Sequence, residues 1–272
     1  MEPDQLRQIL VDVAARAVRD GLLPDGAQAG PPAGPLFRPV DARSAGVVAD
    51  WVSPVAQRWG PQLGLQPRHL ARVLAQGLTE QGSIGAVEVT PSGLMAITLT
   101  DLSRSEVIDS VLADDRYGLG AGTTDTTDTA GSPVELPTGA DSPLPEDDPL
   151  RSVQLAHANL CRVVRNAEAV GVSPRGVGPR DSLTHVSERL LQVALADLPQ
   201  RLATAEGDRA QQVRALTDLA DLCDANRHAA RPTVVGAEIE PVHGVRLALA
   251  QAAARVLRNG LARLGATAPE RM

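Results

Sequence analysis

Residues 118–147 constrain the fold more than any other stretch, because they cannot form part of a packed core. The segment reads GLGAGTTDTTDTAGSPVELPTGADSPLPED, which is acidic, low in complexity and rich in Gly, Thr and Pro. Such a composition buries too little apolar surface to offset the entropy that is lost on ordering. We therefore expect a disordered linker over 118–147 and two separately folded domains, over 1–117 and 148–272.

The composition limits what these domains are made of. The 272 residues are 43% hydrophobic but only 1% aromatic, so the cores must be built from Leu, Val and Ala. All 26 basic residues are Arg, which favours a composition bias of the genome over selection at one site. The net charge of −7 argues against a general nucleic-acid-binding protein. Residues 149–272, however, hold 16 Arg against 12 acidic residues, a local charge of +4.

The first domain mixes helix and strand signals. Apolar residues recur at three- and four-residue steps except over 84–100, where two alternating runs flank the turn Thr90-Pro-Ser-Gly93. The expected elements are helices over 3–21, 45–60 (kinked or broken at Pro54), 67–80 and 103–117, with a β-hairpin of strands 84–89 and 94–99. This order predicts a small α+β domain.

The second domain shows helix signals only. Asp148 can cap a helix and Pro149 suits its first turn, and the pattern then runs unbroken to Gly171. The expected helices cover 149–171, 182–204, 208–229 and 239–264. Four amphipathic helices joined by loops predict an all-α bundle.

The amino-acid sequences of two segments resemble those of a known family. The first has an acidic residue and a proline before a Val-Gln-x-Ala-His-Ala run, formed here by Asp148, Pro149, Val153, Gln154, Ala156, His157 and Ala158. The second is the run from Arg255 to Met272, which ends in Pro-Glu-Arg-Met. Together they resemble the opening helix and the closing helix and tail of the DALR-type anticodon-binding domain of arginyl-tRNA synthetases. The resemblance therefore implies a DALR-type bundle over 148–272.

The order of elements over 1–117 resembles the N-terminal additional domain of bacterial arginyl-tRNA synthetases. In that family the domain meets the corner of the tRNA near the D-loop, so the resemblance implies a D-loop contact. The family's Gly-Asp-Tyr element stands here as Gly46-Val47-Val48. A complete synthetase carries its catalytic domain where this chain has residues 118–147. The whole is similar to synthetase-related, NrtL-like anticodon-binding proteins without the catalytic domain.

Motifs of catalysis are missing from the sequence. A synthetase of this class holds ATP with a His-x-Gly-His-like turn and a Lys-Met-Ser-Lys-Ser-like loop, and a chain without Lys cannot carry the second. No nucleotide-binding, metalloprotease or serine-hydrolase motif occurs. The five His residues lie far apart, and Cys161 and Cys223 are expected to be small buried residues. We expect no catalytic residue, cofactor or metal site, no membrane span, and a cytoplasmic, non-enzymatic protein.

Two binding hypotheses remain open. In the first, the protein binds tRNA, with arginine tRNA as the candidate, through the anticodon stem-loop, and it has a protein partner in translation. The residues expected to contact RNA are Arg151, His157, Arg162, Arg165, Asn226, Arg227, Arg231, Arg255, Arg258, Arg271 and Met272. Aromatic rings that would stack on bases are absent: the family's Tyr is Leu155 here, and its aromatic pair falls in Cys223-Asp-Ala-Asn-Arg227. The alternative is a protein-interaction or regulatory module that has lost tRNA binding.

Overall fold

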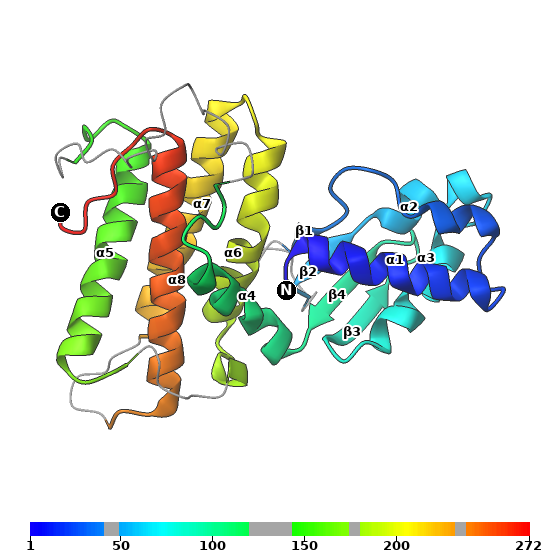
Figure 1. Ribbon diagram of the computed structural model, residues 1–272, viewed down its shortest axis with the longest axis horizontal. Coiled ribbons are helices and arrows are strands. Elements are labelled where there is room, and N and C mark those ends of the chain that lie inside the picture. Colours follow the sequence, from blue (N-terminus) through cyan, green and yellow to red (C-terminus); the bar gives the residue numbers. More distant parts are fainter. Residues whose placement is uncertain (41–48, 120–142, 174–179, 232–237) are drawn as a thin grey trace, which may run out of the picture. The chain divides into compact units, whose positions relative to one another are not determined.

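The chain folds into two compact units, Met1–Arg104 and Ser105–Met272. The computed structural model describes residues 1–40, 49–119, 143–173, 180–231 and 238–272 (Figure 1). The helix α4 (Asp101–Ala113) crosses the boundary between the units. This boundary lies before the expected domain end at residue 117. The reason is that Asn259 of the second unit donates hydrogen bonds to the carbonyl oxygens of Asp115 (2.9 Å) and Tyr117 (3.0 Å).

Two expectations fall largely on parts of the chain outside these ranges. Most of the expected linker over 118–147 is formed by residues 120–142, and Gly46-Val47-Val48 belongs to residues 41–48. Both segments lie outside the described residues, so the disordered linker and the D-loop contact stay predictions. The end of the linker segment is described, and there the backbone N–H of Leu144 donates to Oε1 of Gln154 at 2.8 Å.

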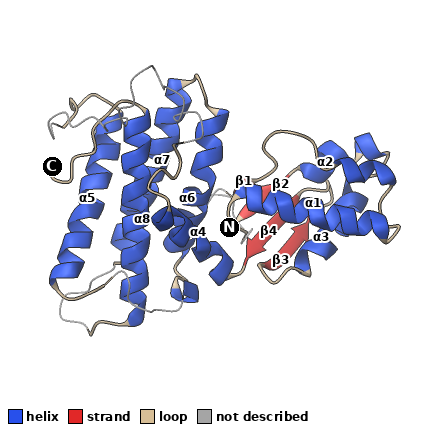
Figure 2. Cartoon of the chain, viewed as in Figure 1, coloured by secondary structure: helices blue, strands red, loops and turns tan. Residues whose placement is uncertain are grey.

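The N-terminal unit is a four-stranded antiparallel sheet packed with helices (Figure 2). Its sheet has the order β1-β2-β4-β3. The elements are α1 (Pro3–Arg19), β1 (Arg38–Pro39), β2 (Trp51–Ser53), α2 (Val55–Trp59), α3 (Pro67–Thr79), β3 (Ile84–Val89), β4 (Met95–Leu99) and the first residues of α4, with short 3-10 helices at Asp25–Ala29 and Pro61–Leu63. The predicted hairpin of two strands is therefore confirmed, as is the α+β class.

The helix expected over 45–60 is wrong in its first part. Residues 51–53 form strand β2, in which Trp51 pairs with Ile97 and Ser53 with Met95 of β4. Trp51 and Ser53 are buried and Val52 is only half-buried, which is the period of a strand. Pro54 then begins the short helix α2. Because an extended residue is favoured before proline, Pro54 separates a strand from a helix and does not kink one helix.

The helices α1 and α3 pack closely because of a glycine. A Cβ atom on Gly77 of α3 would lie 2.5 Å from Cγ1 of Val13 in α1. Glycine inside a helix costs about 1 kcal/mol relative to alanine. At Gly77 this lower helix propensity is the condition for the close contact between α3 and α1. Leu6 and Leu10 of α1 and Leu74 of α3 are fully buried in the core of this unit.

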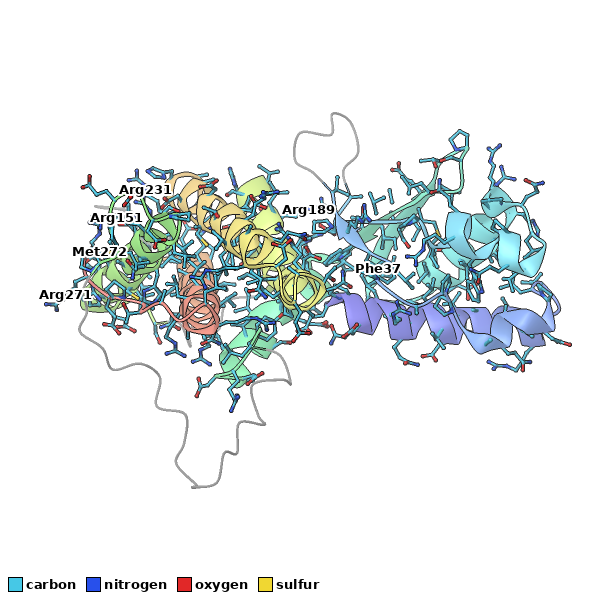
Figure 3. The ribbon with its side chains drawn as sticks, turned by 90° about the horizontal axis from the view of Figure 1, so that it is seen from above. Phe37, Arg151, Arg189, Arg231, Arg271 and Met272 are labelled. Atoms are coloured by element: carbon cyan, nitrogen blue, oxygen red, sulfur yellow. The ribbon has the colours of Figure 1, made fainter. Side chains whose placement is uncertain are left out.

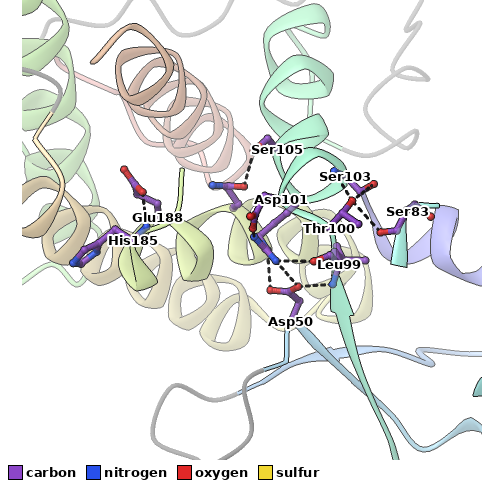
Figure 4. Close-up of polar contacts among 11 residues, drawn as sticks. Asp50, Ser83, Leu99, Thr100, Asp101, Ser103, Ser105, His185 and Glu188 are labelled. Carbon is purple, nitrogen blue, oxygen red and sulfur yellow. Dashed lines mark hydrogen bonds and ion pairs between the residues drawn. The ribbon is translucent and has the colours of Figure 1, made fainter. Parts of the chain in front are cut away.

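A buried ion pair joins the sheet of the N-terminal unit to the start of α4 (Figure 4). Arg104 is 3% exposed and donates from Nε to Oδ1 of Asp50 at 2.9 Å, while Asp50 is fully buried. Asp50 also accepts the backbone N–H of Leu99 at 2.7 Å, and Arg104 also contacts Asp101. Burial acts to lower the pKa of Arg104, but the bonds and charges of the two aspartates outweigh it and raise that pKa.

The C-terminal unit is a helical bundle, as predicted from the sequence (Figure 2). It consists of α4 from Ser105 onward, α5 (Leu150–Ala169), α6 (Val186–Thr204), α7 (Arg209–Ala229) and α8 (Pro241–Arg263), with a short 3-10 helix at Arg180–Ser182. The helix α8 has buried residues on nearly all of its sides, among them Leu247, Leu249 and Val256. Burial on so many sides places α8 in the centre of the bundle, with its arginines and Gln251 on the side that stays partly exposed.

Pro199 lies inside α6, and a residue from another segment compensates for it. Proline has no N–H, so it cannot donate to the carbonyl of Leu195 four residues earlier. The hydroxyl of Tyr117, the residue that follows α4 after a short turn, donates to that carbonyl at 3.3 Å. The single tyrosine of the sequence therefore satisfies a buried acceptor that proline leaves open.

Among the described residues, no helix combines the length and the apolar character that crossing a membrane would require.

Candidate nucleic-acid interface

The candidate site is built on α5 and on the C-terminal tail, residues 264–272. Asp148 accepts the backbone N–H of Leu150 at 2.8 Å, so the expected acidic residue does support the start of α5. The tail follows α8 and runs beside α5 (Figure 1). The two sequence segments that suggested the family are thus in direct contact.

Two residues of the Val-Gln-x-Ala-His-Ala run hold the tail on α5. Gln154 is fully buried, and its Nε2 donates to the carbonyl of Thr267 at 2.8 Å. His157 is 4% exposed, and its Nδ1 lies 3.0 Å from the carbonyl of Pro269. Residues three apart lie on the same face of a helix, so both side chains reach the same strip of tail. The motif therefore has a physical role in fixing the tail.

The tautomer of His157 follows from its partners. A carbonyl can only accept, so Nδ1 carries the proton and donates to Pro269. When the ring is neutral, Nε2 is an acceptor, and the thiol of Cys161 lies 3.5 Å from it. Burial lowers the pKa of His157, and the charge of Arg258 lowers it further against the opposing bond to Pro269. The ring is thus neutral at physiological pH.

A pocket of about 440 Å³ opens between α5, α8 and the tail. It is lined by Leu112 of α4, by His157, Cys161, Val164 and Arg165 of α5, by Gln251, Ala254, Arg255 and Arg258 of α8, and by Ala268 and Glu270 of the tail. The α5 residues and the α8 residues each follow a three- and four-residue spacing, so each set forms one stripe on its helix. Small side chains such as Ala254 leave the space between the stripes.

Four of the predicted RNA-contacting residues meet at this pocket, namely His157, Arg165, Arg255 and Arg258. Arg255 forms an ion pair with Asp115 at 2.8 Å and donates to the carbonyl oxygens of Val111 and Leu112 at the end of α4. Arg165 donates to the backbone carbonyl of Glu270 at 3.1 Å. The guanidinium groups of Arg255 and Arg165 are therefore held in place around the pocket.

The other predicted residues are not part of this lining, and Figure 3 labels four of them, Arg151, Arg231, Arg271 and Met272. Arg151 is half-buried and donates to the carbonyl of Leu144. Asn226 is buried and accepts a hydrogen bond from Ser187, so it is turned toward protein rather than solvent. The remaining residues are partly or fully exposed: Arg162, which donates to Asn159, Arg227, which pairs with Asp224, and Arg231, Arg271 and Met272.

Sequence reasoning missed several residues of the pocket. Cys161 was expected to be buried, but it is only partly covered and lines the pocket, whereas Cys223 is 1% exposed in the core. Gln154 was recognised as part of a motif but not as an anchor of the tail. Arg255 and Arg258 of α8 were predicted, but Gln251 was not, and no local pattern shows that Arg255 bonds to the end of α4.

Across the ranges that the structure describes, His, Cys, Asp and Glu do not gather in a group of three or more that could hold a metal ion.

The C-terminal unit is therefore a helical bundle that carries a tail-covered arginine pocket on α5 and α8. Residues 153–272 match the family model of the DALR anticodon binding domain, and this part of the chain is a DALR anticodon-binding domain. Arginine–tRNA ligase of Kineococcus radiotolerans is 39% identical over 129 residues, which are 46% of this chain and 23% of that protein. This chain thus spans less than a quarter of that relative's length.

A solved structure of Thermus thermophilus arginyl-tRNA synthetase is also similar, at 30% identity over 44% of this chain and 20% of that chain, with a TM-score of 0.38. These matches concern the anticodon-binding domain and do not include a catalytic domain. The resemblance of the N-terminal unit to the synthetases' additional domain stays a prediction.

Proposed function

We propose that this is a non-catalytic, cytoplasmic RNA-binding protein that binds tRNA, with arginine tRNA as the candidate, through the anticodon stem-loop. The observation that carries the proposal is the DALR anticodon-binding domain over 153–272. Anticodon loops are bound by side chains that contact splayed bases and by arginines on the flanking phosphates. This domain supplies the arginines on α5, on α8 and in the tail.

The non-catalytic part of the proposal rests on the chemistry of the 272 residues. They contain neither the His-x-Gly-His-like turn nor the lysine-containing loop with which this class of synthetase handles ATP. Three arginines line the pocket on α5 and α8, and such a set can bind and orient anions. The thiol of Cys161 lies 3.5 Å from Nε2 of His157, but burial raises the pKa of that thiol, which disfavours the nucleophilic thiolate.

A second function, docking of a protein partner, is favoured by one observation. At the position of the family's Tyr, Leu155 is 46% exposed, and Met272 of the tail is 45% exposed. Aliphatic side chains cannot stack on bases as a ring does, and each missing ring forgoes about 1–3 kcal/mol per base. Exposed aliphatic residues suit a protein partner, so this function is the alternative if tRNA is not retained.

The proposal is tested by charge reversal on α5. We expect the wild-type protein to retain tRNA in a gel-shift experiment at about 50 mM salt, with retention that weakens as salt rises. Changing Arg162→Glu and Arg165→Glu together should abolish this retention, because two phosphate contacts are replaced by repulsion. Unchanged retention by the double variant would show that this face is not the site.

A matched control is available on the same bundle. Arg201 of α6 is partly exposed and Arg214 of α7 is exposed, and both lie outside the predicted site. Arg201 pairs with Asp218 only at the surface, where such pairs contribute about 0–1 kcal/mol. The double variant Arg201→Glu, Arg214→Glu carries the same charge change and should retain tRNA far better than the α5 variant. Equal loss in both would indicate an effect of net charge alone.

A further inference from the structure

Arg258 stands out among the arginines of the pocket because its donors are not used by the protein. The buried Nε of Arg258 has no hydrogen-bond acceptor among the described residues. Its guanidinium also forms no ion pair there. A guanidinium offers five N–H donors, and a buried donor without an acceptor costs about 1–3 kcal/mol. An oxyanion in the pocket would supply the acceptors that the fold does not.

The charges around the pocket favour an anion. Arg165, Arg255 and Arg258 face it, and Glu270 is the acidic side chain in the lining. Glu270 is 75% exposed, and its carboxylate lies 3.6 Å from Arg165, so its negative charge is largely in solvent. Arg255 is engaged with Asp115 and with the end of α4. Arg258 and Arg165 are therefore the groups with donors available to a ligand.

The pocket is larger than a single oxyanion requires. Its volume of about 440 Å³ lies within the range of about 300–1,000 Å³ that is usual for small-molecule sites. Apolar side chains form part of the lining, among them Leu112, Val164 and Ala254. An apolar surface next to unpaired arginine donors suits a ligand with a phosphate at one end and a flat ring at the other.

We propose that this pocket binds one nucleotide, with its phosphate on Arg258 and Arg165 and its base against the surface formed by Leu112, Val164 and Ala254. The nucleotide is either free in solution or part of a bound RNA. The second source rests on the proposed function, whereas the recognition of a phosphate by Arg258 does not.

The chain contains its own probe of the pocket. Cys161 lines it and is only partly covered, while Cys223 is 1% exposed and serves as an unreactive reference. Burial raises the pKa of the Cys161 thiol, so alkylation by iodoacetamide is best followed at roughly pH 9. The rate of Cys161 alkylation, read by mass spectrometry of the intact full chain, reports on whether the pocket is filled.

Saturating AMP should slow the alkylation of Cys161 at least tenfold, and adenosine, which lacks the phosphate, should slow it far less. Arg258→Gln should remove the protection by AMP, and Arg165→Gln should weaken it. Arg214→Gln removes the same charge from an exposed site on α7 and should be protected like the wild type. An unreactive Cys223 in each variant shows that the core is folded.

Protection by tRNA as well as AMP would identify the ligand as a nucleotide of bound RNA, and protection by AMP alone would identify a free nucleotide. Equal protection by adenosine, unaltered protection in Arg258→Gln, or no protection by AMP or tRNA would each overturn the inference. Retention of tRNA without protection of Cys161 would overturn it and leave the proposed function standing. Protection of Cys161 by AMP in a protein that retains no tRNA would support the inference and overturn the proposed function.

Discussion

Asp197 is a carboxyl group buried within α6, where it is 3% exposed. Burial raises the pKa of Asp197 to about 6, and the charge of Arg201 one turn later opposes this only in part. The folded state therefore holds the proton more tightly than the unfolded chain, whose aspartate titrates near pH 3.9. The stabilising effect of the protonated form is complete below about pH 4 and is lost as the pH rises through 6.

Asp197→Asn should remove this pH dependence. The variant should be more stable than the wild type at pH 8, by up to about 3 kcal/mol, because it no longer buries a charge. The difference should shrink toward pH 4, where the native carboxyl group is neutral as well. Urea unfolding at both pH values measures it, and an equal difference at pH 4 and pH 8 would contradict the assignment.

Substitution of Leu155 tests whether the absence of an aromatic ring at this position weakens RNA binding. It is 46% exposed, so a larger side chain fits there without disturbing the core. Leu155→Tyr should tighten tRNA binding by about fivefold to a hundredfold, the equivalent of the 1–3 kcal/mol that one stacked base contributes. Leu155→Met, an aliphatic control, should leave the affinity unchanged. Equal affinities of the Tyr variant and the wild type would show that no base reaches this position.

At the scale of residues, the sequence predicted part of the site. The motif on α5 and the arginines of α8 were recognised, and four of the predicted residues line one pocket. The roles of Gln154 and His157 in holding the tail were not predicted, because their partners lie more than 100 residues away. A helical pattern shows which residues share a face, but it does not show what packs on that face.

The helix α6 depends on a partner outside itself, since Pro199 leaves the carbonyl of Leu195 to Tyr117. Tyr117→Phe should therefore destabilise the protein by about 1–3 kcal/mol, the cost of a buried acceptor without a donor. In a Pro199→Ala background, the new backbone N–H can bond to Leu195 within the helix. There the same tyrosine substitution should cost much less.

A double-mutant cycle measured by chemical unfolding checks this coupling. The two substitutions should be non-additive, with Tyr117→Phe tolerated only when residue 199 carries an N–H. If Tyr117→Phe costs the same in both backgrounds, the hydroxyl does not compensate for the proline.

At the scale of elements, the helices of the bundle were predicted from their periodicity, and the sheet was predicted only in part. The hairpin of β3 and β4 is local, so its turn and alternating pattern reveal it. Strands β1 and β2 have two and three residues, and β2 pairs with a strand more than 40 residues later. Such short runs carry too few alternations to be distinguished from a helix, and long-range pairing leaves no local signal.

At the scale of the whole molecule, charge is distributed unevenly along the chain, and the basic excess lies in the C-terminal half. Residues 149–272 carry a net charge of +4 within a chain of −7, and nearly all of them belong to the DALR anticodon-binding domain over 153–272. Arginine contacts to RNA phosphates release the counterions condensed on the RNA, so binding of that kind weakens as salt rises. Salt dependence therefore distinguishes RNA binding from the docking of a protein partner through exposed Leu155 and Met272.

The most direct measurement is the affinity of the full chain for a labelled anticodon stem-loop hairpin, determined by fluorescence anisotropy between about 50 and 200 mM salt. We expect saturable binding that weakens steadily as salt rises and that exceeds binding to a DNA duplex of equal length. No binding at the lowest salt, or equal affinity for hairpin and duplex, would contradict it.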